Sequence, residues 1–319
     1  MSHIFSPDHF LPFFNATKLL KEPFEEAIKD MCNKLQEDQP SCVISDWFLG
    51  WTNASCLGFG IPRLVFHGMG VYAIAVKKSL SIYQTHVNKG LDFNVIILNV
   101  KGVQLSFALS TADLSNSLMD MESEISRFFL EAEKSDLGSW GVIANSFVEL
   151  EKDYVGSLES LYGNETKAFC VGPLFLYEQI LEGNRFALNL KEPANPQTNP
   201  SRTNRDRSKG LIVKEWVDQK WILAHKAIGG FLSHCRWNST LESLANGVPI
   251  LAWPMQAEQH LNAKYLVEEL KIGLRVPNFK RDVGNIVERT LISKGVRELM
   301  GGKRGKQARE KAIEFWKGG

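Results

Sequence analysis

The stretch of residues 216–259 limits the fold of this chain more than any other part of it. A short apolar run at 229–233, bracketed by small residues, is followed by an amphipathic run at 237–244 and a second apolar run at 248–253. Short apolar runs of this kind are typical of buried strands, and the middle run is typical of a helix. A strand, a helix and a second strand in this order predict a parallel sheet in an α/β fold.

The junction between the first strand and the helix carries polar side chains that suit a phosphate ligand. The unpaired N–H groups and the positive dipole end of the helix favour an anion at this point. Asn238 and Ser239 add side-chain donors, and His234 can donate an imidazole N–H. Glu242, one turn further along, can accept from two neighbouring hydroxyls of a ribose, and Trp216 offers a flat face to a base. The segment therefore predicts a nucleotide site.

The loop after the second strand ends in Glu258 and Gln259, an acid beside an amide. Open α/β sheets bind ligands at the carboxyl ends of their strands. An acid and an amide side by side can bind the adjacent hydroxyls of a hexose. We therefore expect a sugar next to the predicted nucleotide.

Each of these residues also has an ordinary structural role. Trp216 and His234 can be core residues, Asn238 or Ser239 can cap a helix, and Glu242 can be a capping-box acid. For any one of these residues taken alone, the structural role is the more frequent one. The spacing of the whole set favours the binding site.

The order of these residues resembles the signature box of the plant secondary-product UDP-glycosyltransferases. In that family a Trp-x-x-Gln opening, a His-Cys-Gly-Trp-Asn-Ser centre and a closing acid-Gln pair lie at the intervals found in residues 216–259. The resemblance implies an α/β fold of GT-B type with two Rossmann-like domains, both incomplete in this chain. It also implies that the donor substrate is a UDP-sugar and that no metal or other cofactor takes part.

The resemblance assigns a role to each position of the box. Trp216 is expected to stack on uracil with Gln219 nearby, and Glu242 is expected to hold the ribose. Three residues are expected to hold the diphosphate: His234, Asn238 and Ser239. Three more are expected to contact the transferred sugar: Trp237, Glu258 and Gln259.

One residue departs from the family pattern, because Arg236 stands where the family has glycine. A glycine at a turn beside a phosphate allows a close backbone approach or a positive φ angle. Arg236 therefore points outward, pairs with the diphosphate or blocks it. We expect it to impair donor binding.

The N-terminal half predicts a second βαβ arrangement. An apolar run at 41–46 ends in Asp46, an amphipathic segment reaches about residue 57, and a second apolar run covers 62–66. At such a position an aspartate is most often a helix N-cap. In the resembled family, however, the matching aspartate orients a histidine that acts as general base on the acceptor hydroxyl.

The histidine that should partner Asp46 is missing from its expected place. His3 and His9 precede Asp46, but neither has the apolar strand and the glycine that would position a base. His67 follows the second strand and can line the acceptor site, although a structural role is the more frequent one for such a residue. We therefore expect Asp46 to lack a catalytic partner.

Three parts are expected along the chain. Residues 1–177 form an acceptor-side α/β domain, residues 178–210 a polar linker rich in Pro, Asn, Arg and Ser, and residues 211–319 the UDP-sugar-binding α/β domain. By resemblance, the first βα units of both domains and the final helix are missing, so the chain is expected to be truncated at its N-terminus and internally deleted. Amphipathic helices are expected from residue 287 to 316, broken at Gly301 and Gly302.

Composition narrows the possible partners. The 319 residues can build two domains, and a net charge of +1 gives no electrostatic reason to bind nucleic acid or an anionic membrane surface. The five cysteines show no metal-binding spacing and are expected to be buried free thiols of a reducing compartment. No apolar run reaches the length of a membrane span. We expect a cytoplasmic monomer with no metal site, no nucleic-acid partner and no stable membrane insertion.

The resemblance implies a UDP-sugar-dependent glycosyltransferase. It is expected to transfer a hexose, with glucose favoured by Gln259, to a hydroxyl of a small hydrophobic acceptor, inverting the anomeric centre. The alternative is a catalytically inactive truncated homologue, or a residual module that only binds UDP-sugar.

Overall fold

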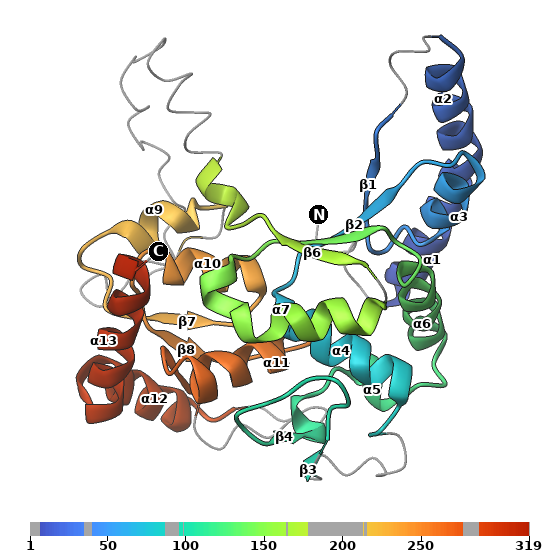
Figure 1. Cartoon of the computed structure of the whole chain (residues 1–319). Coiled ribbons are helices and arrows are strands. Elements are labelled where there is room, and N and C mark those ends of the chain that lie inside the picture. Colours follow the sequence, from blue (N-terminus) through green and yellow to red (C-terminus); the bar gives the residue numbers. More distant parts are fainter. Residues whose placement is uncertain are drawn as a thin grey trace, which may run out of the picture.

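Two parallel sheets organise the chain (Figure 1). The structure is a computed structural model that describes residues 7–34, 40–86, 96–97, 99–163, 165–177, 213, 216–276 and 287–318. The first sheet has the order β1-β2-β5-β6, and the second has the order β7-β8-β9. All neighbouring strands within these two sheets run parallel. The predicted α/β class is therefore confirmed.

The first sheet and its helices form what we call the N-terminal lobe. Its strands are β1 (Val43–Asp46), β2 (Arg63–His67), β5 (Gly141–Ala144) and β6 (Lys167–Cys170). Its helices are α1 (Pro7–Thr17), α2 (Lys21–Lys34), α3 (Trp51–Gly58), α4 (Val71–Tyr83), α5 (Asn116–Met119), α6 (Glu124–Asp136) and α7 (Val148–Tyr162). A short antiparallel ribbon joins β3 (Ile96–Ile97) to β4 (Leu109–Ser110). The strand and helix predicted around Asp46 are present.

The second sheet and its helices form the C-terminal lobe. Its strands are β7 (Phe231–Ser233), β8 (Ile250–Ala252) and β9 (Gly273–Arg275). Its helices are α9 (Gln219–Ala224), α10 (Trp237–Leu244), α11 (Gln259–Lys264), the π-helical turn η4 (Tyr265–Glu269), α12 (Arg289–Gly301) and α13 (Lys303–Gly318). The strand-helix-strand prediction is confirmed with shorter strands, and the predicted break falls between α12 and α13. The predicted linker lies outside the described residues.

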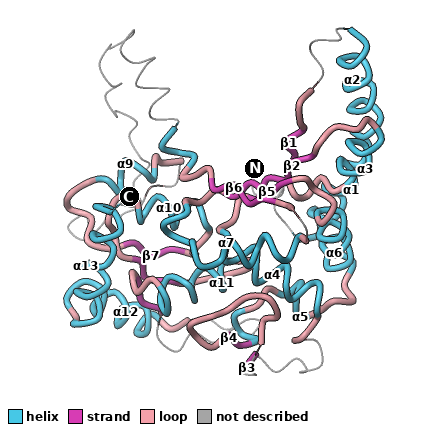
Figure 2. Tube along the Cα trace, viewed as in Figure 1, coloured by secondary structure: helices cyan, strands magenta, loops and turns pink. Residues whose placement is uncertain are grey.

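Side chains of both lobes share one apolar core. The rings of Tyr72 and Tyr265 stack with their centroids 4.8 Å apart, and Tyr154 packs edge-on against both. The Tyr265 hydroxyl donates to the Leu150 carbonyl at 2.6 Å. In Figure 2, α4 and α7 lie between the strands of the two sheets. Tyr72 belongs to α4 and Tyr154 to α7, whereas Tyr265 begins η4. The two lobes are therefore packed together as one body.

The five cysteines are free thiols, as predicted, but only two of them are buried. Cys56 and Cys235 lie in the interior, whereas Cys42 is exposed because it precedes β1 at the edge of its sheet. The prediction that all five are buried was wrong. Burial raises the pKa of Cys235 to about 12, so its thiol stays protonated at neutral pH.

Candidate functional site

The turn between β7 and α10 takes its unusual backbone conformation at Cys235. Cys235 has a φ of 65°, and its backbone N–H donates to the Ser233 hydroxyl at 3.1 Å. Arg236 is the N-cap residue of α10, with an extended backbone at φ −63° and ψ 144°. Any residue adopts that conformation, so the positive φ expected as a reason for glycine at position 236 was wrong.

A polar group joins α9 to one face of α10. The Gln219 amide donates to the Ser239 hydroxyl at 3.1 Å and to the Glu242 carboxylate at 2.7 Å. Helix α9 begins at Gln219 because Asp218 accepts from the backbone N–H of Lys220 and Trp221. The structure thus brings together three residues predicted to bind UDP: Gln219, Ser239 and Glu242.

Trp216 precedes this group with 88% of its surface exposed. An indole of this size is rarely left in water without a partner in a folded protein. Its ring is therefore available for stacking with a base. The contact with uracil itself stays a prediction.

His234 lies directly after β7, and the charges of Arg236 and Glu258 act on its pKa. Partial burial and then the positive charge of Arg236 lower the pKa of His234. The imidazole is therefore neutral at pH 7, with one nitrogen as a donor and the other as an acceptor. That form can still donate to a phosphate oxygen, as predicted for this residue.

A cavity of about 350 Å³ opens between the two lobes. Its N-terminal wall is largely aromatic, with Trp47, Phe48, Phe66 and Phe129. The polar and charged residues on its walls are Asp46, His67, Lys77, Ser115, Ser117, Arg236, Asn238 and Glu258. An aromatic wall with a few converging polar groups is typical of a site for a small organic ligand.

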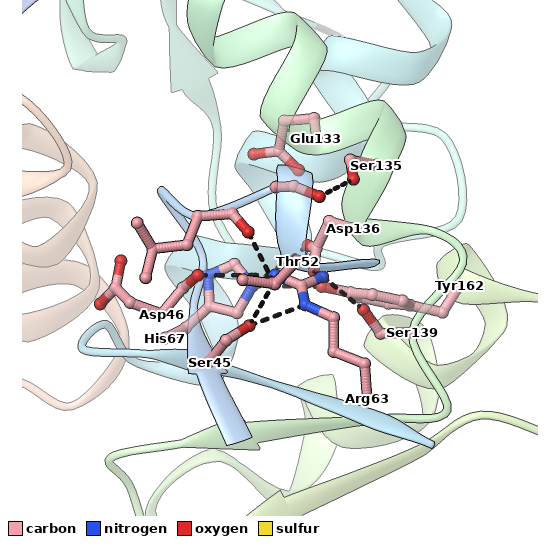
Figure 3. Close-up of polar contacts among 12 residues, drawn as sticks. Ser45, Asp46, Thr52, Arg63, His67, Glu133, Ser135, Asp136, Ser139 and Tyr162 are labelled. Carbon is pink, nitrogen blue, oxygen red and sulfur yellow. Dashed lines mark hydrogen bonds and ion pairs between the residues drawn. The ribbon is translucent and has the colours of Figure 1, made fainter. Parts of the chain in front are cut away.

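Asp46 lies on this cavity at the end of β1. Its Oδ1 accepts the backbone N–H of Phe48 at 2.9 Å in the turn after β1. The N-cap of α3 is Gly50, so Asp46 does not have the helix-cap role considered for it from the sequence. Among the described residues, no histidine is hydrogen-bonded to Asp46. In Figure 3 its carboxylate points away from the polar network behind it.

His67 belongs to that network rather than to Asp46. Its Nε2 lies 3.2 Å from Asp136 Oδ2 and 3.2 Å from the Tyr162 hydroxyl (Figure 3). Tyr162 in turn donates to Asp136. His67 is 2% exposed, so the structural role considered for it from the sequence is the one seen here.

The same network holds several buried charges, which we call the N-lobe charge cluster: Arg63, Lys77, Lys78, Glu133 and Asp136. Lys78 donates to Glu133 at 2.8 Å and to Asp136 at 2.9 Å, with none of its side chain exposed. Burial by itself raises the pKa of Asp136, but the charges of Lys78 and His67 outweigh it and hold the pKa well below its usual range. Asp136 is therefore ionised at neutral pH.

Lys77 connects the charge cluster to the cavity. Its ammonium lies 3.2 Å from the Glu133 carboxylate and 3.4 Å from the centre of the Trp47 ring. Burial lowers the pKa of Lys77, although Glu133 acts against that shift. The cation–π contact holds Trp47 in place on the cavity wall.

Two of the three predicted sugar-binding side chains are used inside the protein. Trp237 is 1% exposed, and its indole N–H donates to the Asn145 carbonyl at 2.7 Å. Gln259 is 2% exposed, and its carbonyl oxygen accepts from the backbone N–H of Met255 and Gln256 at 2.9 and 3.0 Å. Only Glu258 lines the cavity. Contact of Trp237 or Gln259 with a sugar stays a prediction. Only the atoms that do not take part in these bonds are available for it.

The backbone at Gly70 explains why the indole of Trp237 fits against the N-terminal lobe. A Cβ atom at Gly70 would lie 2.6 Å from the Trp237 ring and 2.8 Å from the Glu151 carboxylate. No side chain fits in that space. The glycine before α4 therefore lets the two lobes approach each other.

Sequence reasoning missed Asn145, which joins the two lobes, and Glu151, which caps α4 within the N-terminal lobe. The Asn145 amide donates to the Asn238 side chain at 3.0 Å, and its oxygen accepts the backbone N–H of Leu174 at 3.0 Å. The Glu151 carboxylate accepts the first backbone N–H groups of α4, from Val71 at 2.8 Å and Tyr72 at 2.9 Å. Burial raises the pKa of Glu151 to about 7. The only sequence signal for Asn145 is a polar residue directly after an apolar strand.

Comparison with known proteins identifies the family. The model of the UDP-glucoronosyl and UDP-glucosyl transferase family matches residues 189–283. UDP-glycosyltransferase 90A1 of Arabidopsis thaliana is 35% identical over 97% of this chain and 73% of its own length. Scopoletin glucosyltransferase of Nicotiana tabacum is 30% identical over 92% of this chain and 72% of its own length. The chain belongs to the plant UDP-glycosyltransferases, as its signature box predicted.

Solved structures support the same fold. UGT2 of Phytolacca americana, in complex with UDP-2fluoro-glucose and pterostilbene, matches 95% of this chain and 76% of its own length, with a TM-score of 0.77 and 25% identity. UGT71G1 of Medicago truncatula, complexed with UDP-glucose, matches 94% of this chain and 74% of its own length, with a TM-score of 0.74 and 24% identity. The GT-B type predicted from the sequence is confirmed, and the family's donor is a UDP-sugar.

No group of three or more His, Cys, Asp and Glu side chains that could hold a metal ion occurs among the described residues. Within the same residues, no helix has the length and apolar character needed to cross a membrane. By family, the chain is a glycosyltransferase that acts on small plant metabolites.

Proposed function

We propose that this chain binds UDP-glucose at the start of α10 and transfers the glucose, with inversion, to a hydroxyl of a small hydrophobic acceptor in the cavity between the lobes. The observation that carries the proposal is the position of the cavity. It places Asp46 and an aromatic wall opposite Asn238 and Glu258, beside the group formed by Gln219, Ser239 and Glu242.

The donor is held by the residues of the signature box. Trp216 stacks on the uracil, and Glu242 accepts from the ribose hydroxyls, for which it exchanges its present bond to Gln219. Neutral His234, Asn238, Ser239 and the first N–H groups of α10 hold the diphosphate. These donors stabilise the negative charge that develops on UDP as it leaves.

The acceptor binds in the cavity, against the aromatic side chains of its wall. Its hydroxyl oxygen attacks the anomeric carbon, the bond from that carbon to the diphosphate oxygen breaks, and UDP leaves with the electron pair. The hydroxyl proton goes to the Asp46 carboxylate, whose Oδ2 is not used by the turn that Oδ1 caps. A carboxylate without a histidine is a weaker base, so we expect a rate about 10²–10⁴ lower than with a well-matched base.

The second candidate function is binding of UDP-sugar without transfer. The observation that favours it is that no histidine is hydrogen-bonded to Asp46 in the described part of the chain. The two functions differ in one measurable product, the glucoside. Glu258 binds the sugar and Asn238 the diphosphate in both.

The test is to incubate the full chain with UDP-glucose and an aromatic hydroxyl compound and to follow the glucoside by mass spectrometry. We expect slow formation of a β-glucoside, abolished in Asp46→Asn and unchanged in Asp153→Asn, which alters an exposed aspartate in the same way. Saturable UDP-glucose binding with no glucoside would support the binding module instead. An α-linked product would contradict inversion.

A further inference from the structure

The side chain of Arg236 lies on the wall of the cavity between the lobes. It makes no hydrogen bond and no ion pair with another residue among those the structure describes. The positive charge of Arg236 lowers the pKa of His234, so the two side chains lie within electrostatic reach of each other. Arg236 is therefore a permanent cation that faces the cavity without a bonded counter-ion.

Nothing in the local fold requires an arginine at this position. Arg236 is the N-cap residue of α10, but its side chain makes no capping bond, because a guanidinium has no acceptor atom. Its extended backbone suits any residue. The side chain is thus free to serve a ligand.

The other charges of the cavity do not neutralise Arg236. Lys77 is already paired with Glu133 at 3.2 Å and covered by the Trp47 ring. Asp46 and Glu258 line the same cavity, but neither forms an ion pair with Arg236 within 4.0 Å. Arg236 is exposed at the cavity, so a negatively charged group on a ligand bound there can reach its guanidinium.

The position of Arg236 separates it from the predicted ribose site. Ser239 and Glu242 face α9 through Gln219, whereas Arg236 and Asn238 line the cavity together with Asp46. The reacting sugar and the acceptor lie on the cavity side in the proposed reaction. Asn238, which we propose holds the diphosphate, lines the same cavity, so an anion bound by Arg236 belongs to the sugar, the acceptor or the diphosphate.

We propose, building on the function proposed above, that Arg236 selects a substrate that carries a carboxylate, on the sugar or on the acceptor. A planar guanidinium matches a carboxylate with two parallel hydrogen bonds, which a lysine or a glutamine cannot make. Position 236 is then a specificity-determining residue. The family glycine at this position offers no such contact.

The experiment compares two matched ligand pairs by calorimetry on the full chain. UDP-glucuronate against UDP-glucose tests a carboxylate on the sugar, and 4-hydroxycinnamate against 4-hydroxycinnamyl alcohol tests one on the acceptor. We expect the wild type to bind the carboxylate member of one pair about ten-fold more tightly. Arg236→Gln should lose that preference and Arg236→Lys should keep only part of it. Arg127→Gln, which removes an exposed arginine paired with Glu122, should retain it.

Two results would overturn the proposal. One is a wild type that distinguishes neither pair. The other is an Arg236→Gln variant that binds UDP itself more weakly by the same factor as every UDP-sugar, which would assign the charge to the diphosphate. The aromatic pair is also titrated without UDP, so a chain that fails to bind UDP refutes the proposed function while the preference for a carboxylate is still measured.

Discussion

The N-terminal lobe holds a cluster of buried charges that are paired with one another, whereas two charged residues after the strands of the C-terminal lobe, Arg236 and Glu258, line the cavity. Lys78 and Asp136 have none of their side chains exposed and lie 2.9 Å apart. Arg236 and Glu258, by contrast, line the cavity without an ion pair between them. Buried charges depend on their partners, because removing one partner destabilises the folded state. Unpaired charges at strand ends are available to a ligand.

The tryptophans of the two lobes also differ in their surroundings. In the N-terminal lobe Trp47 lines the cavity and is fixed by the Lys77 ammonium. In the C-terminal lobe Trp237 is buried against the other lobe, and Trp216 is 88% exposed. The cavity wall is therefore pre-formed, while Trp216, which we propose stacks on the base, is exposed.

The largest loss of stability is expected when one charge of the N-lobe charge cluster is removed. Asp136→Asn leaves Lys78 and Arg63 with one carboxylate fewer in a site that water does not reach. Breaking such a buried pair costs about 3–5 kcal/mol, so we expect that loss in the free energy of unfolding by urea denaturation. Asp153→Asn, on the exposed face of α7, should change it by less than about 0.5 kcal/mol. Equal effects of the two variants would show that the cluster does not hold the fold.

The pH dependence of the free energy of unfolding tests the raised pKa of Glu151. The pKa of Glu151 is about 7 in the folded chain against an ordinary value of 4.5, so the protonated form is the one that folding favours. Its contribution is complete below pH 4.5 and is lost as the pH rises towards 7, by about 2–4 kcal/mol.

The difference in stability between the wild type and Glu151→Gln, measured from pH 4.5 to 8, isolates this carboxyl. His86 and His234 have lowered pKa values and act in the opposite direction, but both are common to the two proteins. Glu151→Gln keeps the shape but has one acceptor oxygen for the two backbone N–H groups of α4, so it should be less stable at low pH. A difference that does not change with pH would contradict the raised pKa.

A smaller loss of stability is expected when the hydrogen bond between Trp237 of the C-terminal lobe and Asn145 of the N-terminal lobe is removed. Trp237→Phe keeps an aromatic ring but leaves the Asn145 carbonyl without its donor in a buried site. We expect a loss of about 1–3 kcal/mol in the free energy of unfolding. Trp221→Phe changes a tryptophan of the same lobe that is 79% exposed and should have almost no effect. If both variants were neutral, the indole contact would not join the lobes.

The sequence predicted those parts of the molecule that depend on local patterns. The strand-helix-strand unit from β7 to β8 and the place of Asp46 at the end of β1 follow from short apolar runs and the polar residues after them. The signature box predicted the family because its residues lie close together in the chain. The cluster of Gln219, Ser239 and Glu242 could be expected for the same reason.

Contacts between distant parts of the chain could not be predicted in this way. Trp237 and Asn145 are 92 positions apart, and no periodicity shows that the indole turns towards the other lobe rather than towards a sugar. Glu151 caps a helix that begins about 80 residues earlier in the chain, at Val71. Of the two reasons considered for the family's glycine at position 236, a positive φ does not apply here, because the turn places that conformation one residue earlier, at Cys235.

Calorimetric titration of the full chain with UDP tests most directly whether the C-terminal lobe is a nucleotide site. We expect saturable binding at one site, about ten-fold weaker in Glu242→Gln because an uncharged amide accepts less strongly from the ribose hydroxyls. Glu310→Gln, on the exposed surface of α13, should bind as the wild type does. A chain that unfolds cooperatively but binds no UDP, or a Glu242→Gln variant with unchanged affinity, would contradict the nucleotide site described here.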